Sequence, residues 1–373
     1  MNRTTQLALL DRVQAHRASG RETDTAATVY QQPVSAYTSL DRHRAELAML
    51  TRMPTMAGFS DLLPAPGSFA TADVGASPVV MTRDDEGRFR AFLNVCRHRG
   101  APVAEGCGTA SRLTCPYHGW TYHLDGSAAA RRRPSYFEDV EPAALTELPS
   151  LEHHGMLWVS GTPGATIPAD PLHGCGDDMA EFGLADHRLF TSTTFTRPIN
   201  WKLVMDTFLE VYHIAVLHRN TIDPTIHSDY ALFDPFGPHG RMIVTRKSIS
   251  ELDRLPRDDW PFFAHTTLVW MLVPNTVLIY QQDHMQVYQS WPTDRPGESR
   301  ITVSIWVPKD TTRSDEHWQK NFDLLVEVTD TEDFVACAAM QRGFASGAQD
   351  HLTFGRNEPL LQHFEKEVAG LLG

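Results

Sequence analysis

Two short loops, each carrying one cysteine and one histidine, constrain this chain more than any other feature of its 373 residues. The first loop has the sequence CRHRG, with Cys96 and His98, and the second has the sequence CPYHGW, with Cys115 and His118. Thiolates and imidazoles are the side chains that bind transition metals most readily. Because four of them lie so close in the sequence, we expect the chain to fold around a metal centre here.

Zinc and a two-iron cluster are the candidate occupants of this centre. Zinc binds two Cys and two His in a closed tetrahedron, but zinc fingers usually place both cysteines on one element and both histidines on the other. Each loop here repeats the order Cys then His, which favours a 2Fe-2S cluster with both thiolates on one iron and both imidazoles on the other. Histidines that serve only in the core are the third interpretation, and the spacing argues against it.

A second group of candidate ligands lies in a mostly apolar run, EVYHIAVLH, at residues 210–218. On a regular helix Glu210 and His213 would share a face, whereas His218 would lie about 140° from His213. Such a helix would not bring both histidines to one ion, so we expect either a bulge or a helix that ends before His218. Two unrelated histidines, each satisfied by hydrogen bonds, are the alternative interpretation.

A carboxylate in a later helical pattern, from about 315 to 345, supplies a third candidate ligand. Asp333 interrupts an apolar face, and a buried carboxylate needs a counter-charge or a metal. Its neighbours within about 40° on a helical projection are Phe322, Cys337 and Met340. With His213 and His218 it would complete the two-histidine, one-carboxylate set of mononuclear non-haem iron. The competing ligand is Glu332, which projects about 100° away towards the polar side.

Composition excludes several classes of protein. A net charge of -13 argues against a nucleic-acid surface and suits docking to a basic patch on a protein partner. The first twenty residues lack the apolar core of a signal peptide, and no later stretch reaches the ~18 apolar residues of a membrane span. We therefore expect a cytoplasmic protein. An odd number of cysteines argues against a disulfide framework, and Cys107, Cys175 and Cys337 are left without an assigned role.

The order of patterns along the chain predicts an α+β protein with two domains. Residues 1–40 form a helical lead-in, and residues 41–160 contain short strand-like runs with Gly and Pro between them, typical of a small all-β domain. A stretch rich in Pro and Gly, 161–174, is the expected boundary. Residues 175–373 form the larger domain, in which an antiparallel meander over 266–308 is flanked by helical patterns.

Taken together, the two ligand groups resemble those of the catalytic α subunit of Rieske non-haem iron oxygenases, the aromatic-ring-hydroxylating dioxygenase family, from about residue 40 onwards. The resemblance implies an all-β Rieske domain, a helix-grip catalytic domain with one mononuclear Fe(II), and a homotrimer with or without a separate β subunit. The cluster ligands would be Cys96, His98, Cys115 and His118, and the iron ligands would be His213, His218 and Asp333. Trp120 stands where respiratory Rieske proteins carry a hydroxyl, which indicates a low reduction potential.

The resemblance also implies a route for electrons. In this family the cluster of one subunit faces the iron of its neighbour, and a carboxylate joins a cluster histidine to an iron-ligand histidine. Glu210 stands at the position of that carboxylate and would link His118 to His213 in catalysis. The chain has no G-x-G-x-x-G fingerprint after a strand. NAD(P)H would therefore act through a separate reductase, with or without a ferredoxin.

The substrate is expected to be a small aromatic compound, as in aromatic hydrocarbon catabolism. Eight rings are candidates for an aromatic-lined pocket: Trp270, Tyr280, Trp291, Trp306, Phe233, Phe236, Phe262 and Phe263. The alternative is a quaternary-amine monooxygenase or demethylase of the carnitine and betaine type, because the same rings could cage a cation and Glu at 210 is familiar in that branch. Two other classes explain less. A Rieske electron carrier would not explain the second ligand group, with His213 and His218. A helix-grip ligand binder would not explain the cysteine-histidine loops.

Overall fold

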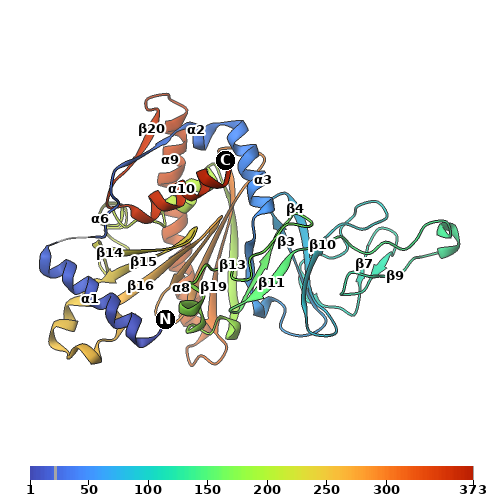
Figure 1. Cartoon of the computed structure of the whole chain (residues 1–373), viewed down its shortest axis with the longest axis horizontal. Coiled ribbons are helices and arrows are strands. Elements are labelled where there is room, and N and C mark those ends of the chain that lie inside the picture. The colour runs from blue at the N-terminus through green and yellow to red at the C-terminus, as the bar shows by residue number, and fades with distance from the viewer. Residues whose placement is uncertain (21–22, 373) are drawn as a thin grey trace. The chain divides into compact units, whose positions relative to one another are not determined.

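The computed structural model describes residues 1–20 and 23–372, apart from the side chain of Asp229. These residues form two compact units (Figure 1). The smaller comprises residues 47–171 and 183–188, and the larger comprises residues 1–46, 172–182 and 189 onwards. The chain is α+β, as predicted, with antiparallel sheets in both units. No helix in the described part is long and apolar enough to cross a membrane.

The smaller unit is built from short antiparallel strands. Its sheets have the orders β10-β5-β4-β3-β6, β11-β12-β2 and β7-β8-β9. The strands are β2 (Thr55–Phe59), β3 (Ser68–Val74), β4 (Ser77–Arg83), β5 (Phe89–Leu93), β6 (Cys107–Thr109), β7 (Leu113–Thr114), β8 (Thr121–Tyr122), β9 (Ala128–Ala130), β10 (Glu147–Leu148), β11 (Ser150–His153) and β12 (Met156–Val159). One cysteine-histidine loop follows β5 and the other joins β7 to β8, so both loops are held between strands.

The larger unit is organised by a seven-stranded sheet of order β13-β19-β18-β17-β16-β15-β14 (Figure 1). Its strands are β13 (His187–Arg197), β14 (Ile226–Phe236), β15 (His239–Arg246), β16 (Thr266–Leu272), β17 (Thr276–Tyr280), β18 (Met285–Pro292) and β19 (Ser299–Pro308). A two-stranded sheet pairs β1 (Tyr30–Pro33) with β20 (His351–Phe354). Every residue of β16 is buried, and after Thr266 and Thr267 the strand is apolar throughout rather than alternating.

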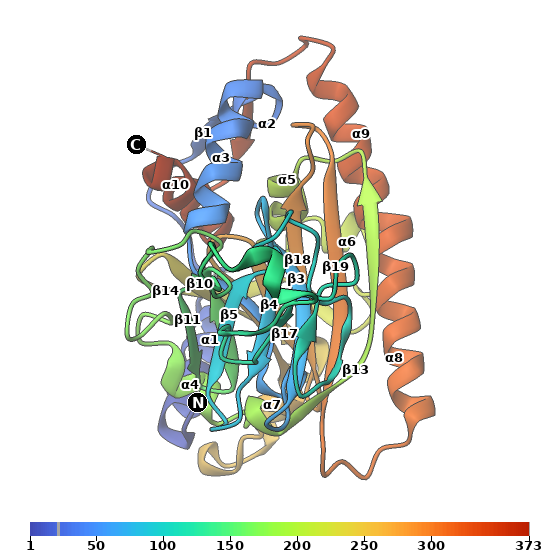
Figure 2. The same cartoon turned by 90° about the vertical axis from the view of Figure 1, so that its right-hand side faces the viewer.

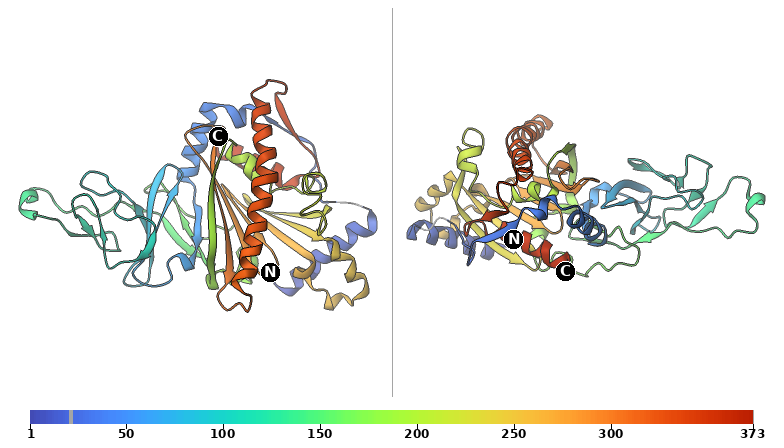
Figure 3. Two further views of the ribbon diagram at one scale, coloured as in Figure 1. Left: turned by 180° about the vertical axis from the view of Figure 1, so that it is seen from behind. Right: turned by 90° about the horizontal axis from the view of Figure 1, so that it is seen from above.

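Ten α-helices are found among the described residues. They are α1 (Arg3–Ser19), α2 (Ser35–Thr38), α3 (Leu40–Arg52), α4 (Gly176–Ala180), α5 (Trp201–Asp206), α6 (Ile214–Leu217), α7 (Phe262–His265), α8 (Asp315–Val328), α9 (Phe334–Phe344) and α10 (Pro359–Leu372). The N-terminal lead-in belongs to this unit, because α1 packs against β14. Figures 2 and 3 show α8 and α9 running one after the other along the side of the sheet that carries β13 and β19.

Two helical patterns depart from the regular helices that the sequence indicates. The run around 200–218 is not one helix, because α5 ends at Asp206 and α6 begins only at Ile214. Between α8 and α9, residues Thr329–Asp333 form a π-helical turn. The extra residue in this turn changes the angular relation between positions before and after it. Met340, expected on the apolar face with Asp333, is exposed, although it lies in the regular helix α9 and no residue of the turn separates it from Asp333.

Candidate metal centres and cavity

Each cysteine-histidine loop is a tight turn closed by two backbone hydrogen bonds. The cysteine N–H donates to the carbonyl five residues later, and the glycine N–H donates back to the cysteine carbonyl. The bonds are Cys96 to Ala101 (2.8 Å) and Gly100 to Cys96 (2.9 Å) in one loop, and Cys115 to Trp120 (2.8 Å) and Gly119 to Cys115 (3.0 Å) in the other. Both glycines have positive φ, which a side chain would disfavour. The two loops therefore have the same construction.

The four candidate cluster ligands all lie in the smaller unit and differ in burial. Cys96 and Cys115 are buried in its core, whereas His98 and His118 are only partly buried and bring their Nδ1 atoms to 3.1 Å from each other. Trp120 stacks on His98 with 4.9 Å between ring centroids. Partial burial and the neighbouring His118 lower the pKa of His98, which keeps its imidazole neutral and able to bind a metal. Two buried thiols beside two partly buried imidazoles fit a cluster bound by two residues of each kind.

Tyr122 is a site residue that the sequence analysis missed. Its hydroxyl accepts a hydrogen bond from the backbone N–H of Arg97 (2.9 Å) and lies 3.4 Å from Sγ of Cys96, where it can donate to a thiolate. Burial, together with this contact to Cys96, raises the pKa of Tyr122, so the hydroxyl keeps its proton. Although Trp120 replaces a hydroxyl residue, Tyr122 supplies a hydroxyl donor to the sulfur of Cys96. A Tyr two residues beyond Trp120, facing back across the β7-β8 hairpin, was the available signal.

We expect Tyr122→Phe to lower the reduction potential of the cluster by about 60 mV. The hydrogen bond from Tyr122 to a charged sulfur stabilises the reduced form by about 1.4 kcal/mol, which corresponds to that potential for one electron. A redox titration followed by the visible spectrum measures this change. Tyr117→Phe is the matched control, since the Tyr117 ring lies against His118 and is exposed. An unchanged potential in Tyr122→Phe would show that the hydroxyl does not tune the cluster.

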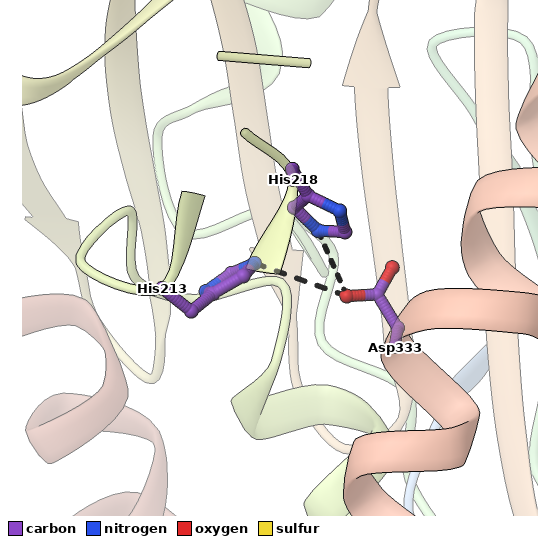
Figure 4. A group of neighbouring side chains, drawn as sticks. All are labelled: His213, His218 and Asp333. Carbon is purple, nitrogen blue, oxygen red and sulfur yellow. Dashed lines mark ion pairs between the residues drawn. The ribbon is translucent and has the colours of Figure 1, made fainter. Parts of the chain in front are cut away.

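The second centre brings together His213, His218 and Asp333, whose nearest ligand atoms all lie within 4.8 Å of one another (Figure 4). Oδ1 of Asp333 lies 3.0 Å from Nε2 of His218 and 3.8 Å from Nε2 of His213. This oxygen is buried and has no hydrogen-bond partner among the described residues. A buried carboxylate oxygen without a partner is costly. Its position between two imidazole nitrogens fits a metal ion.

Local irregularity brings these ligands together. His213 directly precedes the short helix α6, and His218 follows its last residue, which is the second of the two arrangements expected from the sequence. Asp333 is the last residue of the π-helical turn. Single-turn π-helices are frequent at functional sites because they re-aim one side chain without ending the helix.

Two further carboxylates orient the histidines. Glu210 binds Nδ1 of His213 and accepts from the backbone N–H groups of Tyr212 and His213, and Glu332 binds Nδ1 of His218. Carboxylates at both Nδ1 atoms favour the tautomer in which Nδ1 is protonated and Nε2 carries a lone pair. Both Nε2 lone pairs then face Oδ1 of Asp333, which is the arrangement of a metal site. Glu332, the competing ligand in the sequence analysis, orients His218 instead.

A proton can compete with a metal for His218. Burial disfavours its charged form, but the negative charges of Asp333 and Glu332 beside its ring outweigh burial and raise its pKa above the ordinary value. As the pH is lowered, protons therefore begin to displace a metal from this centre at a higher pH than they would from an isolated histidine.

A buried ion pair and its hydrogen bonds anchor α5, which leads into the irregular stretch. Nζ of Lys202 is fully buried and binds Glu46 (2.7 Å) and the carbonyl of Ala36 (2.6 Å). The indole N–H of Trp201 donates to the same Glu46 carboxylate (2.8 Å). Asn200 caps the helix by accepting from the N–H of Lys202 (2.9 Å). Fixing this helix limits how far Glu210 and His213 can move.

The second centre opens into a cavity of about 480 Å³. Its apolar wall comprises Ile222, Ile226, Met242, Val244, Val269, Ile279, Leu325 and Val328, and its polar groups include Thr267, Arg246, Gln281 and Asp283. The aromatic rings that line it are Phe208 and Tyr288, 4.2 Å apart between centroids.

The expected aromatic lining is wrong, because none of the eight candidate rings lines this cavity. On β16, β17 and β18, the positions of Trp270, Tyr280 and Trp291 alternate with those of the lining residues and so face the other side of the sheet. Trp270 and Tyr280 instead pack around Phe182.

Comparisons with known proteins agree with this geometry. The ring hydroxylating alpha subunit catalytic domain matches residues 184–373, and the Rieske [2Fe-2S] domain matches residues 54–141. The glycine betaine monooxygenase oxygenase subunit of Pseudomonas aeruginosa is 31% identical over 333 residues, which are 79% of this chain and 77% of that protein. The carnitine monooxygenase oxygenase subunit of Acinetobacter baumannii is 33% identical over 169 residues. That match covers 44% of this chain and about half (46%) of the relative.

A solved structure shares the fold. It is a quaternary ammonium Rieske monooxygenase, described for carnitine oxidation by gut microbiota and for inter-subunit electron transfer, with a TM-score of 0.79 and 21% identity over 94% of this chain and 96% of its own. At this identity the likeness concerns the fold alone.

Proposed function

Because this chain belongs to the Rieske-type ring hydroxylating oxygenases, we propose that it is the oxygenase subunit of a monooxygenase that acts on a small quaternary ammonium compound. The observation that carries the proposal is the group of His213, His218 and Asp333 at the wall of a cavity of about 480 Å³. The relatives named above act on carnitine and glycine betaine. They favour the quaternary amine over the aromatic compound that the sequence analysis ranked first.

The residues of both centres fit the groups that the family implies. Cys96, His98, Cys115 and His118 would hold the 2Fe-2S cluster, and His213, His218 and Asp333 would hold the iron. When bound, these groups supply one-electron transfer and activation of O₂. The protein supplies orientation of the ligands and an apolar cavity that excludes water around the substrate.

Phe208 and Tyr288 suit a quaternary ammonium group. Both rings lie against each other in the lining of the cavity that contains the three ligands. The faces of aromatic rings attract cations, and a trimethylammonium group cannot use hydrogen bonds instead. Burial raises the pKa of Tyr288, so this ring stays neutral. Hydroxylation of a carbon bonded to the nitrogen would give an unstable carbinol, which breaks its C–N bond to an aldehyde and a tertiary amine.

Glu210 is the proposed entry point for electrons. Its carboxylate binds Nδ1 of His213 directly, and its neighbour Tyr212 is exposed. We extend the proposal to a homotrimer in which this carboxylate couples His213 to the cluster of a neighbouring subunit. An NAD(P)H-dependent reductase, with or without a ferredoxin, would reduce that cluster.

We expect Glu210→Gln to keep both metal centres loaded and to reduce turnover by about 10- to 100-fold, because the amide keeps the shape but loses the charge that orients His213. Metal analysis and single-turnover electron transfer measure the two effects. Glu327→Gln removes the same charge from an exposed position on α8 and serves as the control. Transfer at the wild-type rate in Glu210→Gln would exclude this route.

The substrate class is tested by reductant consumption coupled to product formation in the enzyme reconstituted with a reductase. We expect carnitine, γ-butyrobetaine or glycine betaine to give stoichiometric aldehyde and amine. Benzoate and phenol should leave reductant consumption at its background rate, because Phe208 and Tyr288 do not form a flat slot for a planar aromatic substrate. Coupled turnover confined to the aromatic compounds would contradict the proposed substrate class without changing the metal ligands.

A further inference from the structure

We propose that Arg246 binds a carboxylate of the substrate, so that the cavity takes a zwitterion with its ammonium end beside the iron ligands and its anionic end at Arg246. The proposal rests on the proposed function, because it assigns the second end of the same ligand. It starts from Arg246, which β15 contributes to the cavity lining; the lining also contains Arg313, which pairs with Asp283 (3.4 Å).

Arg246 is partly buried and lacks the charged partner that such a guanidinium normally has. Its Nη2 donates to the amide oxygen of Gln281 (2.9 Å) and to the hydroxyl of Thr267 (3.2 Å), both of them neutral acceptors. Nε is buried without a partner, and Nη1 makes no hydrogen bond within the described residues, so three of its five donors are unused. Burial lowers the pKa of Arg246 despite the opposing effect of Asp283, as expected for a charge without a counter-ion.

Arg241, on the same strand, shows what the usual arrangement is. Its side chain is buried and bound by the carboxylates of Asp178 and Asp234. Arg246 has no carboxylate partner in the described part of the chain. The nearby acid Asp283 is already engaged by His284 (2.8 Å) and His317 (3.1 Å). An anion from outside the protein would therefore complete the environment of Arg246.

The strand register places Arg246 away from Tyr288. Met242, Val244 and Arg246 share one face of β15, and Val244 pairs with Thr267. Gln281, which holds the guanidinium, lies four residues beyond Val277, the partner of Tyr288. Four residues of strand span about 13 Å, so Arg246 and the Phe208–Tyr288 pair mark separate regions of the cavity.

The wall between these regions is mostly apolar, with Gln286 as a polar member, and it sets the shape of the ligand. Ile222 and Ile226 follow His218 in the sequence and line the cavity, and Ile226 pairs directly with Arg246 in the sheet. A ligand that reaches both regions needs an apolar spacer between its charges. We therefore infer that the preferred substrate class is an ω-trimethylammonium carboxylate with several methylene groups, such as γ-butyrobetaine, rather than glycine betaine.

Calorimetric titration of the metal-loaded protein tests the inference with matched ligands. The probes are γ-butyrobetaine, its methyl ester, which lacks the negative charge, and 5,5-dimethylhexanoate, which lacks the positive charge. We expect the wild type to bind the acid about ten- to a hundredfold more tightly than the ester, the range that charged hydrogen bonds provide. Arg246→Gln should abolish this preference while leaving ester binding within about twofold, and Arg246→Lys should keep part of it.

Arg254→Gln removes the same charge from an exposed position outside the cavity and should keep the wild-type preference. Equal binding of acid and ester by the wild type would overturn the anion site while leaving the amine proposal intact, and this comparison needs no variant. Equal weakening of both ligands in Arg246→Gln would also overturn it, by assigning Arg246 a structural role. Tight binding of 5,5-dimethylhexanoate that is lost in Arg246→Gln would support the anion site and contradict the quaternary-amine proposal.

Discussion

The convergence of three acceptor atoms on one point is the constraint on which the catalytic unit depends. Oδ1 of Asp333 faces the Nε2 atoms of His213 and His218, and none of the three can donate to another when each Nδ1 carries the proton. Such an arrangement is unfavourable without a bound cation. The π-helical turn before α9 and the short helix α6 hold the atoms in this arrangement. The carboxylates of Glu210 and Glu332 keep both rings oriented.

The sequence predicts those parts of the site that depend on short-range spacing. The four candidate cluster ligands could be selected because each loop is a closed turn whose Cys and His are two or three residues apart. The second centre could be found by residue type, but not its geometry, because a helical projection at 100° per residue cannot include a π-turn. The projection also placed Met340 on the face of Asp333, but Met340 lies two turns further along α9 and is exposed. The choice of Asp333 was unaffected, because Asp333 and the nearer Cys337 are both buried.

The rest of the site depends on long-range pairing. Tyr122 reaches Cys96 only through the hairpin of β7 and β8, and Arg246 reaches the cavity only through its place on β15. Which face of a fully buried strand lines a cavity cannot be decided from its sequence, because both faces are apolar. For this reason the aromatic residues of the meander, among them Trp270, suggested a lining that the structure does not have.

The most direct test of the account is the iron and acid-labile sulfide content of three purified proteins. We expect about three irons and two sulfides per chain in the wild type, and about two of each in Asp333→Ala, which should lose the mononuclear iron and keep the cluster. Glu332→Ala should retain the third iron with about 10- to 100-fold weaker affinity, because it removes an orienting group and no ligand. Full iron content in Asp333→Ala, or loss of the third iron only in Glu332→Ala, would contradict the assignment of Asp333 as the ligand.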